Sequence, residues 1–147
     1  MTRGVLVLAP VGSGKTYWLR KINNTKWLDG DTLLKKENIK NFHYYWYSDN
    51  KIRERNEINN IFEKYMSDGY NILYSGNPEY MKYDILIIPD KFVRKERLDN
   101  RKAYIPRKNL FDLENDYYEK HSKICKYIFR CNIDDYLLCV AEYISKH

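Results

Sequence analysis

Residues 5–16 read Val5-Leu6-Val7-Leu8-Ala9-Pro10-Val11-Gly12-Ser13-Gly14-Lys15-Thr16. The first four form a run of β-branched and leucine side chains, which is typical of a strand buried in a parallel sheet. Ala9-Pro10 ends that run, and two glycines precede Lys15 and Thr16. A helix is expected over residues 16–22, because apolar side chains recur there on one face. This succession of strand, glycine turn and helix indicates an α/β fold.

The loop between Ala9 and Thr16 resembles the Walker A motif, with alanine where the pattern has its first glycine. Glycines let backbone amides surround phosphate oxygens, and the start of the helix adds its dipole. Lys15 would reach the β and γ phosphates, and Thr16 would ligate Mg²⁺. The expected nucleotide ligands are Pro10, Val11, Gly12, Ser13, Gly14, Lys15 and Thr16. The alternatives are a chance glycine turn and a degenerate loop that binds nucleotide without turnover.

The rest of the chain alternates short apolar runs with amphipathic stretches. Further strands are expected at residues 26–29, 71–74, 84–88 and 127–130. Helices are expected near residues 31–34 and over 58–66, 90–101, 110–124 and 132–144. In the helix at 110–124, Leu113 and Tyr117 are expected to face the core. This alternation predicts a parallel sheet covered by helices on both faces and joined by right-handed crossovers.

Three features together resemble the P-loop kinases of the nucleoside monophosphate kinase-like group: the phosphate loop, the sequence Leu28-Asp29-Gly30-Asp31 and arginines after the fourth strand. The group includes nucleotide, shikimate, gluconate and polynucleotide 5′-hydroxyl kinases. The resemblance implies a three-layer P-loop NTPase fold, with a five-stranded parallel sheet of order 2-3-1-4-5 and helices on both faces. It also implies ATP and Mg²⁺, an acceptor bound beyond the second strand, and an arginine-bearing lid at about residues 90–109.

By that resemblance, Asp29 and Asp31 are the acid/base and metal-shell candidates. They follow the second strand at its carboxyl end, the side of an α/β sheet where ligands collect. One carboxylate would orient or deprotonate the acceptor hydroxyl, while the other helps to hold Mg²⁺ through water. The alternative is a turn in which Asp31 only caps a short helix, since Asp-Gly is a common turn dipeptide.

Four arginines follow the fourth strand. Arg94, Arg97 and Arg101 are spaced to share one helical face, and Arg107 lies in the loop beyond. Guanidinium groups supplied by a closing lid neutralise the charge that develops on a transferring phosphoryl group. The resemblance favours Arg97 and Arg101 for this role, with Arg94 and Arg107 as nucleotide contacts. The alternative is a solvated charged face, because lysines and a glutamate lie nearby.

The third strand ends without the acidic residue that most P-loop ATPases carry there. It continues into Ser75-Gly76-Asn77, which would line the acceptor pocket or form a plain turn. Asp84 and Asp90 flank the fourth strand and do not replace that carboxylate. This absence argues against a motor-type ATPase, and it is compatible with a kinase in which Thr16 and the second-strand aspartates hold the metal.

Residues 41–47 are rich in aromatic side chains, and the formal net charge is +6. Such a cluster could stack on the bases of single-stranded nucleic acid, and a basic chain attracts polyanions. Core packing beneath a loop is the preferred interpretation, because large aromatic side chains dominate protein cores.

The sequence therefore predicts one domain over residues 1–147 that acts as an ATP- and Mg²⁺-dependent kinase on a nucleotide or a related phosphorylated small molecule. One alternative is a polynucleotide 5′-hydroxyl kinase or another enzyme acting on nucleic acid. Another is an inactive nucleotide-binding regulatory protein, such as one of viral origin. No signal or membrane segment is recognised, so a cytoplasmic location is expected. Oligomeric state does not follow from the sequence.

Overall fold

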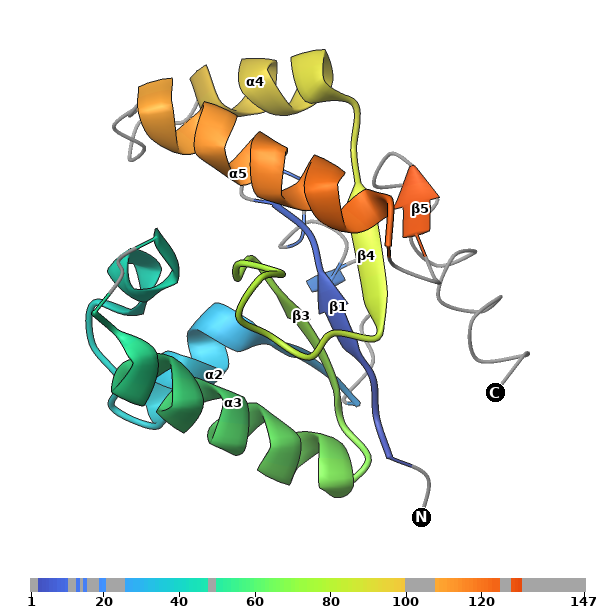
Figure 1. The fold of residues 1–147 in the computed structure, drawn as a ribbon. Helices are drawn as coiled ribbons and strands as arrows, with labels where there is room; N and C mark the ends of the chain where they lie inside the picture. The colour runs from blue at the N-terminus through green and yellow to red at the C-terminus, as the bar shows by residue number, and fades with distance from the viewer. Residues whose placement is uncertain are drawn as a thin grey trace.

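The computed structural model describes residues 3–10, 13, 15, 19–20, 26–47, 50–99, 108–124 and 128–130. Its centre is a five-stranded sheet of order β2-β3-β1-β4-β5, in which every neighbouring pair runs parallel (Figure 1). The strands are β1 Leu6–Leu8, β2 Trp27–Asp29, β3 Asn71–Tyr74, β4 Ile85–Ile88 and β5 Ile128–Arg130. This strand order is the one that the resemblance to P-loop kinases implied. The central strand β1 is the run that precedes the glycine turn.

The helices fall close to the predicted stretches. They are α2 Gly30–Lys36, the 3₁₀ segment η1 Phe42–Tyr47, α3 Ile52–Ser67, α4 Lys91–Asp99 and α5 Lys108–Ser122. The predicted lid segment, residues 90–109, contains α4 and the start of α5. None of the helices in the described part of the chain is both long and apolar enough to cross a membrane.

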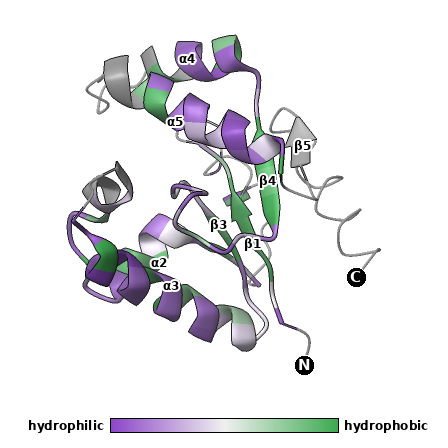
Figure 2. Ribbon diagram, in the orientation of Figure 1, coloured by the Kyte–Doolittle hydropathy of each residue, from purple (hydrophilic) through white to green (hydrophobic). Residues whose placement is uncertain are grey.

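The core is built on one face of the sheet by alternating strand residues. Leu6, Leu8, Ile72 and Tyr74 point to that face, where they pack with side chains of α2, α3, η1 and α5. The intervening residues, such as Val7 and Leu73, are equally buried on the opposite face. Figure 2 shows the hydrophobic colouring concentrated on β1 and β4. Both faces are therefore shielded from water, as the continuous apolar runs predicted.

The described helices account for one of these two faces. α2, α3 and α5 all contribute buried side chains to the same core cluster. The helices predicted over residues 16–22 and 132–144 lie outside the described residues, apart from residues 19 and 20.

Helix α5 has a different inward face from the one predicted. Leu113 is 39% exposed, whereas Glu114 and Tyr118 are buried. The shift by one residue has a polar cause, because Glu114 pairs with Arg94 and the Tyr118 hydroxyl donates to the carbonyl of Gly76 at 2.9 Å. Apolar periodicity alone therefore misplaced this helix by about a quarter turn.

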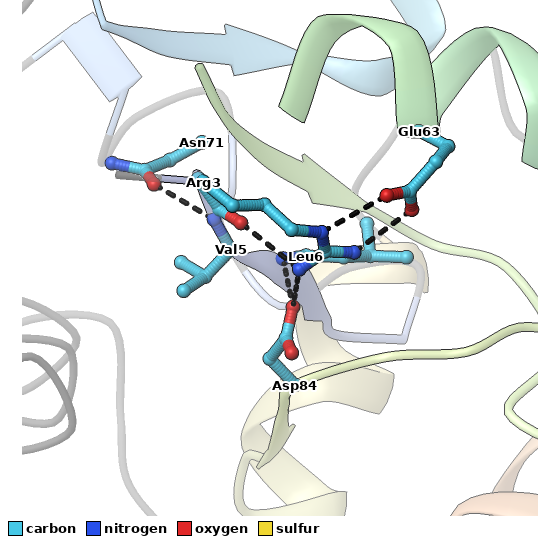
Figure 3. A network of polar contacts seen from close by, with 7 residues as sticks. Arg3, Val5, Leu6, Glu63, Asn71 and Asp84 are labelled. Carbon is cyan, nitrogen blue, oxygen red and sulfur yellow. Dashed lines mark hydrogen bonds and ion pairs between the residues drawn. The ribbon is translucent and has the colours of Figure 1, made fainter. Parts of the chain in front are cut away.

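Arg3 ties the amino-terminal edge of the sheet to α3 (Figure 3). Its Nε and Nη2 donate to the two carboxylate oxygens of Glu63 at 3.0 and 2.9 Å, and its Nη1 lies 3.4 Å from Asp84 Oδ2. The same Asp84 oxygen accepts the backbone N–H of Leu6 at 2.8 Å. Asp84 therefore fixes the start of β1 and holds Arg3, at the edge opposite the ends where ligands collect in parallel sheets.

Candidate active site

The carboxyl ends of the strands place three chain segments side by side. Leu8 of β1 is in register with Tyr74 of β3, so the residues after these two strands leave the sheet together. Ser75 Oγ donates to the carbonyl of Ala9 at 2.7 Å and joins the two segments directly. Asp29 ends β2 and pairs with Leu73, one position before the end of β3. Strand β3 therefore lies between the segment that follows β1 and the turn that carries the predicted aspartates.

The described part of the phosphate loop folds back on itself. The N–H and Oγ of Ser13 both donate to the carbonyl of Pro10, at 3.2 and 2.5 Å, and Ser13 is fully buried. Lys15 is already helical and half-buried. The chain therefore turns directly after β1, and Lys15 has helical conformation. Val11, Gly12, Gly14 and Thr16 lie outside the described residues.

Asp29 is the N-cap of α2, where we expected Asp31 to be the capping residue. One carboxylate oxygen of Asp29 accepts the backbone N–H of Asp31 at 3.2 Å, and the other accepts the hydroxyl of Thr32 at 3.0 Å. Asp31 lies in the first turn of α2, where a negative charge suits the helix dipole. The start of α2 therefore fixes the position of the Asp29 carboxylate.

Both aspartates lie near the end of β3, because Asp29 is in register with Leu73 and Gly30 packs against Tyr74, whose pKa they affect. Burial is the main cause that raises this pKa above its usual value, while the hydrogen bond from Trp46 opposes the rise. The charges of Asp31 and Asp29 add to the increase. Tyr74 therefore stays neutral, and its ring leaves no room for a side chain at Gly30, the residue between the two aspartates.

Among the predicted lid arginines, the structure describes the side chain of Arg94 alone. Arg94 is 1% exposed, and its Nη1 lies 2.6 Å from Glu114 Oε1. Its Nη2 donates to Asn115 Oδ1 at 2.6 Å, and the guanidinium carbon stacks 4.1 Å from the centre of the Phe111 ring. In this structure Arg94 joins α4 to α5 from within the protein. This position differs from the predicted contact with nucleotide, because the guanidinium faces α5.

The other lid arginines are not placed by the structure. Arg97 belongs to α4, but its side chain is outside the described part of the chain. Arg101 and Arg107 lie in the segment between α4 and α5 that is also outside it. Their predicted roles stay predictions.

Arg55 is a buried cation that the sequence interpretation missed. It is 5% exposed, its Nη1 donates to the carbonyl of Tyr45 at 3.0 Å, and its guanidinium carbon lies 3.9 Å from the centre of the Tyr80 ring. A signal existed, because Arg55 precedes Ile58 by three residues and thus shares the apolar stripe of α3. A charged residue on a buried stripe marks a polar site, and this one adjoins the turn that follows β3.

Phe42 and Trp46 of the aromatic segment pack in the core, which is the interpretation that we preferred over base stacking. Phe42 and Trp46 are 3% and 1% exposed. The carbonyl of Trp46 accepts Asn77 Nδ2 at 2.9 Å, which holds the turn after β3 against η1. Phe42 and Trp46 are therefore too deeply buried to stack on the bases of a nucleic acid.

Of two hollows in the described surface, only the smaller reaches a strand end. The larger of the two, about 900 Å³, runs along the outer face of α3 between Ile52 and Lys64. A second, about 450 Å³, lies beside β2 and reaches Asp29 and Thr32 at one end. Size alone would select the first, but it contains no residue from a strand end, so the site is defined by the strand ends. No group of three or more His, Cys, Asp or Glu that could hold a metal ion occurs among the residues described.

Comparisons with known proteins identify the fold. No protein-family model and no curated protein matches the sequence. Among solved structures, the shikimate kinase from Bacteroides thetaiotaomicron has a TM-score of 0.57 and 16% identity, with 97% of this chain and 98% of that chain covered. The shikimate kinase from Acinetobacter baumannii in complex with shikimate has a TM-score of 0.60 and 13% identity, with coverages of 99% and 94%. An uncharacterized protein from Eubacterium ventriosum has a TM-score of 0.54 and 13% identity over the full length of both chains. The chain therefore has the α/β P-loop kinase fold of these proteins.

Proposed function

We propose that this chain is a small kinase that transfers the terminal phosphoryl group of ATP to a small acceptor carrying an anionic group. The observation that carries the proposal is the turn from Pro10 to Ser13 and the helical Lys15, directly after the central strand of a sheet with the shikimate kinase fold. A cation at that point is suited to the phosphate tail of a nucleotide.

Each candidate residue has a defined chemical task in this proposal. Lys15 binds the β and γ phosphates, and Thr16 with Asp29 or Asp31 would hold Mg²⁺, which lowers the charge repulsion at the phosphates when bound. One of the two aspartates accepts the proton of the acceptor hydroxyl. The acceptor oxygen bonds to the γ phosphorus, and the bond from that phosphorus to the bridging oxygen breaks to release ADP. Arg97 and Arg101 stabilise the charge on the moving group.

The surroundings of β3 support an anionic acceptor. Arg55 is buried against Tyr80, in the turn that begins at Asn77 after β3. A buried guanidinium favours a ligand with a phosphate or carboxylate group. A nucleoside monophosphate and shikimate both carry such a group, and shikimate is the ligand of one structural neighbour.

The test incubates the purified chain with Mg²⁺ and γ-labelled ATP, and with four acceptor classes: nucleoside monophosphates, nucleosides, shikimate with gluconate, and 5′-hydroxyl oligonucleotides. Transfer to a small anionic acceptor is expected, with loss of transfer in Lys15→Met. Lys35→Met is the matched control, because Lys35 is exposed at the end of α2.

Two other outcomes separate the alternatives. ATP binding without transfer to any acceptor would identify an inactive nucleotide-binding protein. Transfer to oligonucleotides alone would identify a polynucleotide kinase. Absence of ATP binding in the wild-type chain would overturn the proposal entirely.

A further inference from the structure

Helix α5 is bound to the connection between β3 and β4 through His121. The imidazole Nε2 lies 2.8 Å from Glu79 Oε2, and Nδ1 lies 2.9 Å from the hydroxyl of Tyr83. Both contacts are satisfied when Nε2 carries the proton, donates to Glu79, and leaves Nδ1 to accept from Tyr83. The His121 side chain is 12% exposed, so water does not readily replace these bonds.

Neighbouring contacts strengthen this attachment. Lys120 Nζ lies 3.2 Å from the same Glu79 oxygen, and the Tyr118 hydroxyl donates to the Gly76 carbonyl at 2.9 Å. The hydrogen bonds from His121, and then from Lys120, lower the pKa of Glu79 and keep its carboxylate charged. The carboxyl-terminal half of α5 is thereby fastened to a connection that starts at the end of β3.

The amino-terminal half of α5 is fastened to α4. Arg94 of α4 reaches Glu114 and Asn115 of α5, each at 2.6 Å. Figure 1 shows α4 lying along α5 on the side away from the sheet. The Arg94 contacts therefore join α4 to α5, and we expect a displacement of α5 to affect α4.

We propose that His121 is a positioning residue that couples the β3–β4 connection, through α5, to the placement of α4. The connection begins at Ser75, directly after β3, whose Leu73 is in register with Asp29, and α4 carries Arg97. The role of this coupling rests on the proposed function, because the position of α4 would depend on whether an acceptor is bound. The mechanical link itself requires only the contacts above.

The test measures hydrogen–deuterium exchange of the ligand-free protein, so that its result does not depend on kinase activity. His121→Phe keeps a ring against Tyr83 but removes both hydrogen bonds. We expect exchange of the α4 amides to rise about fivefold or more, although His121 makes no hydrogen bond or ion pair with α4 among the described residues. His121→Gln, which keeps one donor and one acceptor, should restore much of the protection.

Two further variants test the direction of the coupling. Lys123→Ala, an exposed change near the end of α5, should leave α4 unaltered. Asn115→Ala, which removes one contact to Arg94, should raise exchange in residues 79–84, because coupling between two sites is reciprocal.

Two results would overturn the inference. In the first, His121→Phe raises exchange in residues 79–84 and leaves α4 at its wild-type rate, which would make the contact purely local. In the second, β1 and β3 lose protection by the same factor as α4, which would reduce His121 to a general contribution to stability. A failure of the kinase assay beside a positive exchange result would reject the proposed function and leave the coupling standing.

Discussion

The indole Nε1 of Trp46 donates a hydrogen bond of 2.7 Å to the hydroxyl of Tyr74, and both side chains are buried. The two rings meet edge-on, with centroids 5.8 Å apart. Tyr74 is the last residue of β3, and the backbone of Trp46 also holds Asn77 in the turn that follows. The aromatic segment, for which the sequence favoured core packing, thus supports the end of β3.

Tyr74→Phe is expected to lower the free energy of unfolding by about 1–3 kcal/mol, because it leaves Trp46 Nε1 buried without this acceptor. Urea unfolding measures the loss. Tyr45→Phe is the matched control, since the Tyr45 hydroxyl donates to the Lys40 carbonyl at an exposed position. Equal losses in the two variants would show that burial of the Trp46–Tyr74 bond is not what makes it stabilising.

The same tyrosine predicts a loss of stability at alkaline pH. Burial raises the pKa of Tyr74 in the folded chain. Below about pH 10, the usual tyrosine pKa, both states are neutral and stability is unaffected. Above it the unfolded chain loses the proton and the folded chain does not, so unfolding becomes easier by up to about 1.4 kcal/mol per pH unit. Urea unfolding of wild type and Tyr74→Phe should converge as pH rises, and parallel curves would contradict this account.

The buried Arg94–Glu114 pair predicts a contrast between single and double substitutions. Glu114→Leu alone is expected to cost about 3–5 kcal/mol, because it leaves a guanidinium buried without its carboxylate. Arg94→Met combined with Glu114→Leu should recover most of that loss. The double variant should also bind ATP as the wild type does, measured by calorimetry. Weaker ATP binding with unchanged stability would instead restore Arg94 as a nucleotide ligand.

Asp29→Asn separates the two roles of Asp29, which caps α2 and is a proposed acceptor of the substrate proton. Asparagine caps helices as well as aspartate, so the thermal midpoint should change little. Phosphoryl transfer should fall by about 10²–10⁴-fold if the carboxylate accepts the proton of the acceptor. Asp90→Asn is the matched control, because Asp90 Oδ1 caps α4 through the N–H groups of Phe92 and Val93. Equal activity losses in both variants would remove Asp29 from the proposed chemistry.

Local pattern was sufficient for the elements and their order. The run from Val5 to Leu8 is apolar at every position, which is typical of a strand covered on both faces. Ile58, Phe62 and Met66 recur at helical spacing, and all three are buried on α3. Such signals survive in the sequence because burial is periodic along a strand or a helix.

Local sequence patterns could not predict which side chains from distant elements contact one another. Arg94 pairs with a residue 20 positions away, and His121 with residues 42 and 38 positions away. The spacing of Arg94 from Arg97 indicated a shared helical face but not which neighbour would cover it. Arg55 was detectable in principle, as a charge on an apolar stripe, and was overlooked.

By itself the sequence determined that a strand, a glycine turn and a basic helix start would come first, and that the remaining elements would alternate in a parallel α/β sheet. Those properties depend on residues close together in the chain. Tertiary structure alone decided that Arg94 faces α5 and that His121 joins α5 to the β3–β4 connection. Each of these depends on which polar groups meet inside the fold, where an unpaired one is costly, and that meeting is set by the packing of the whole sheet.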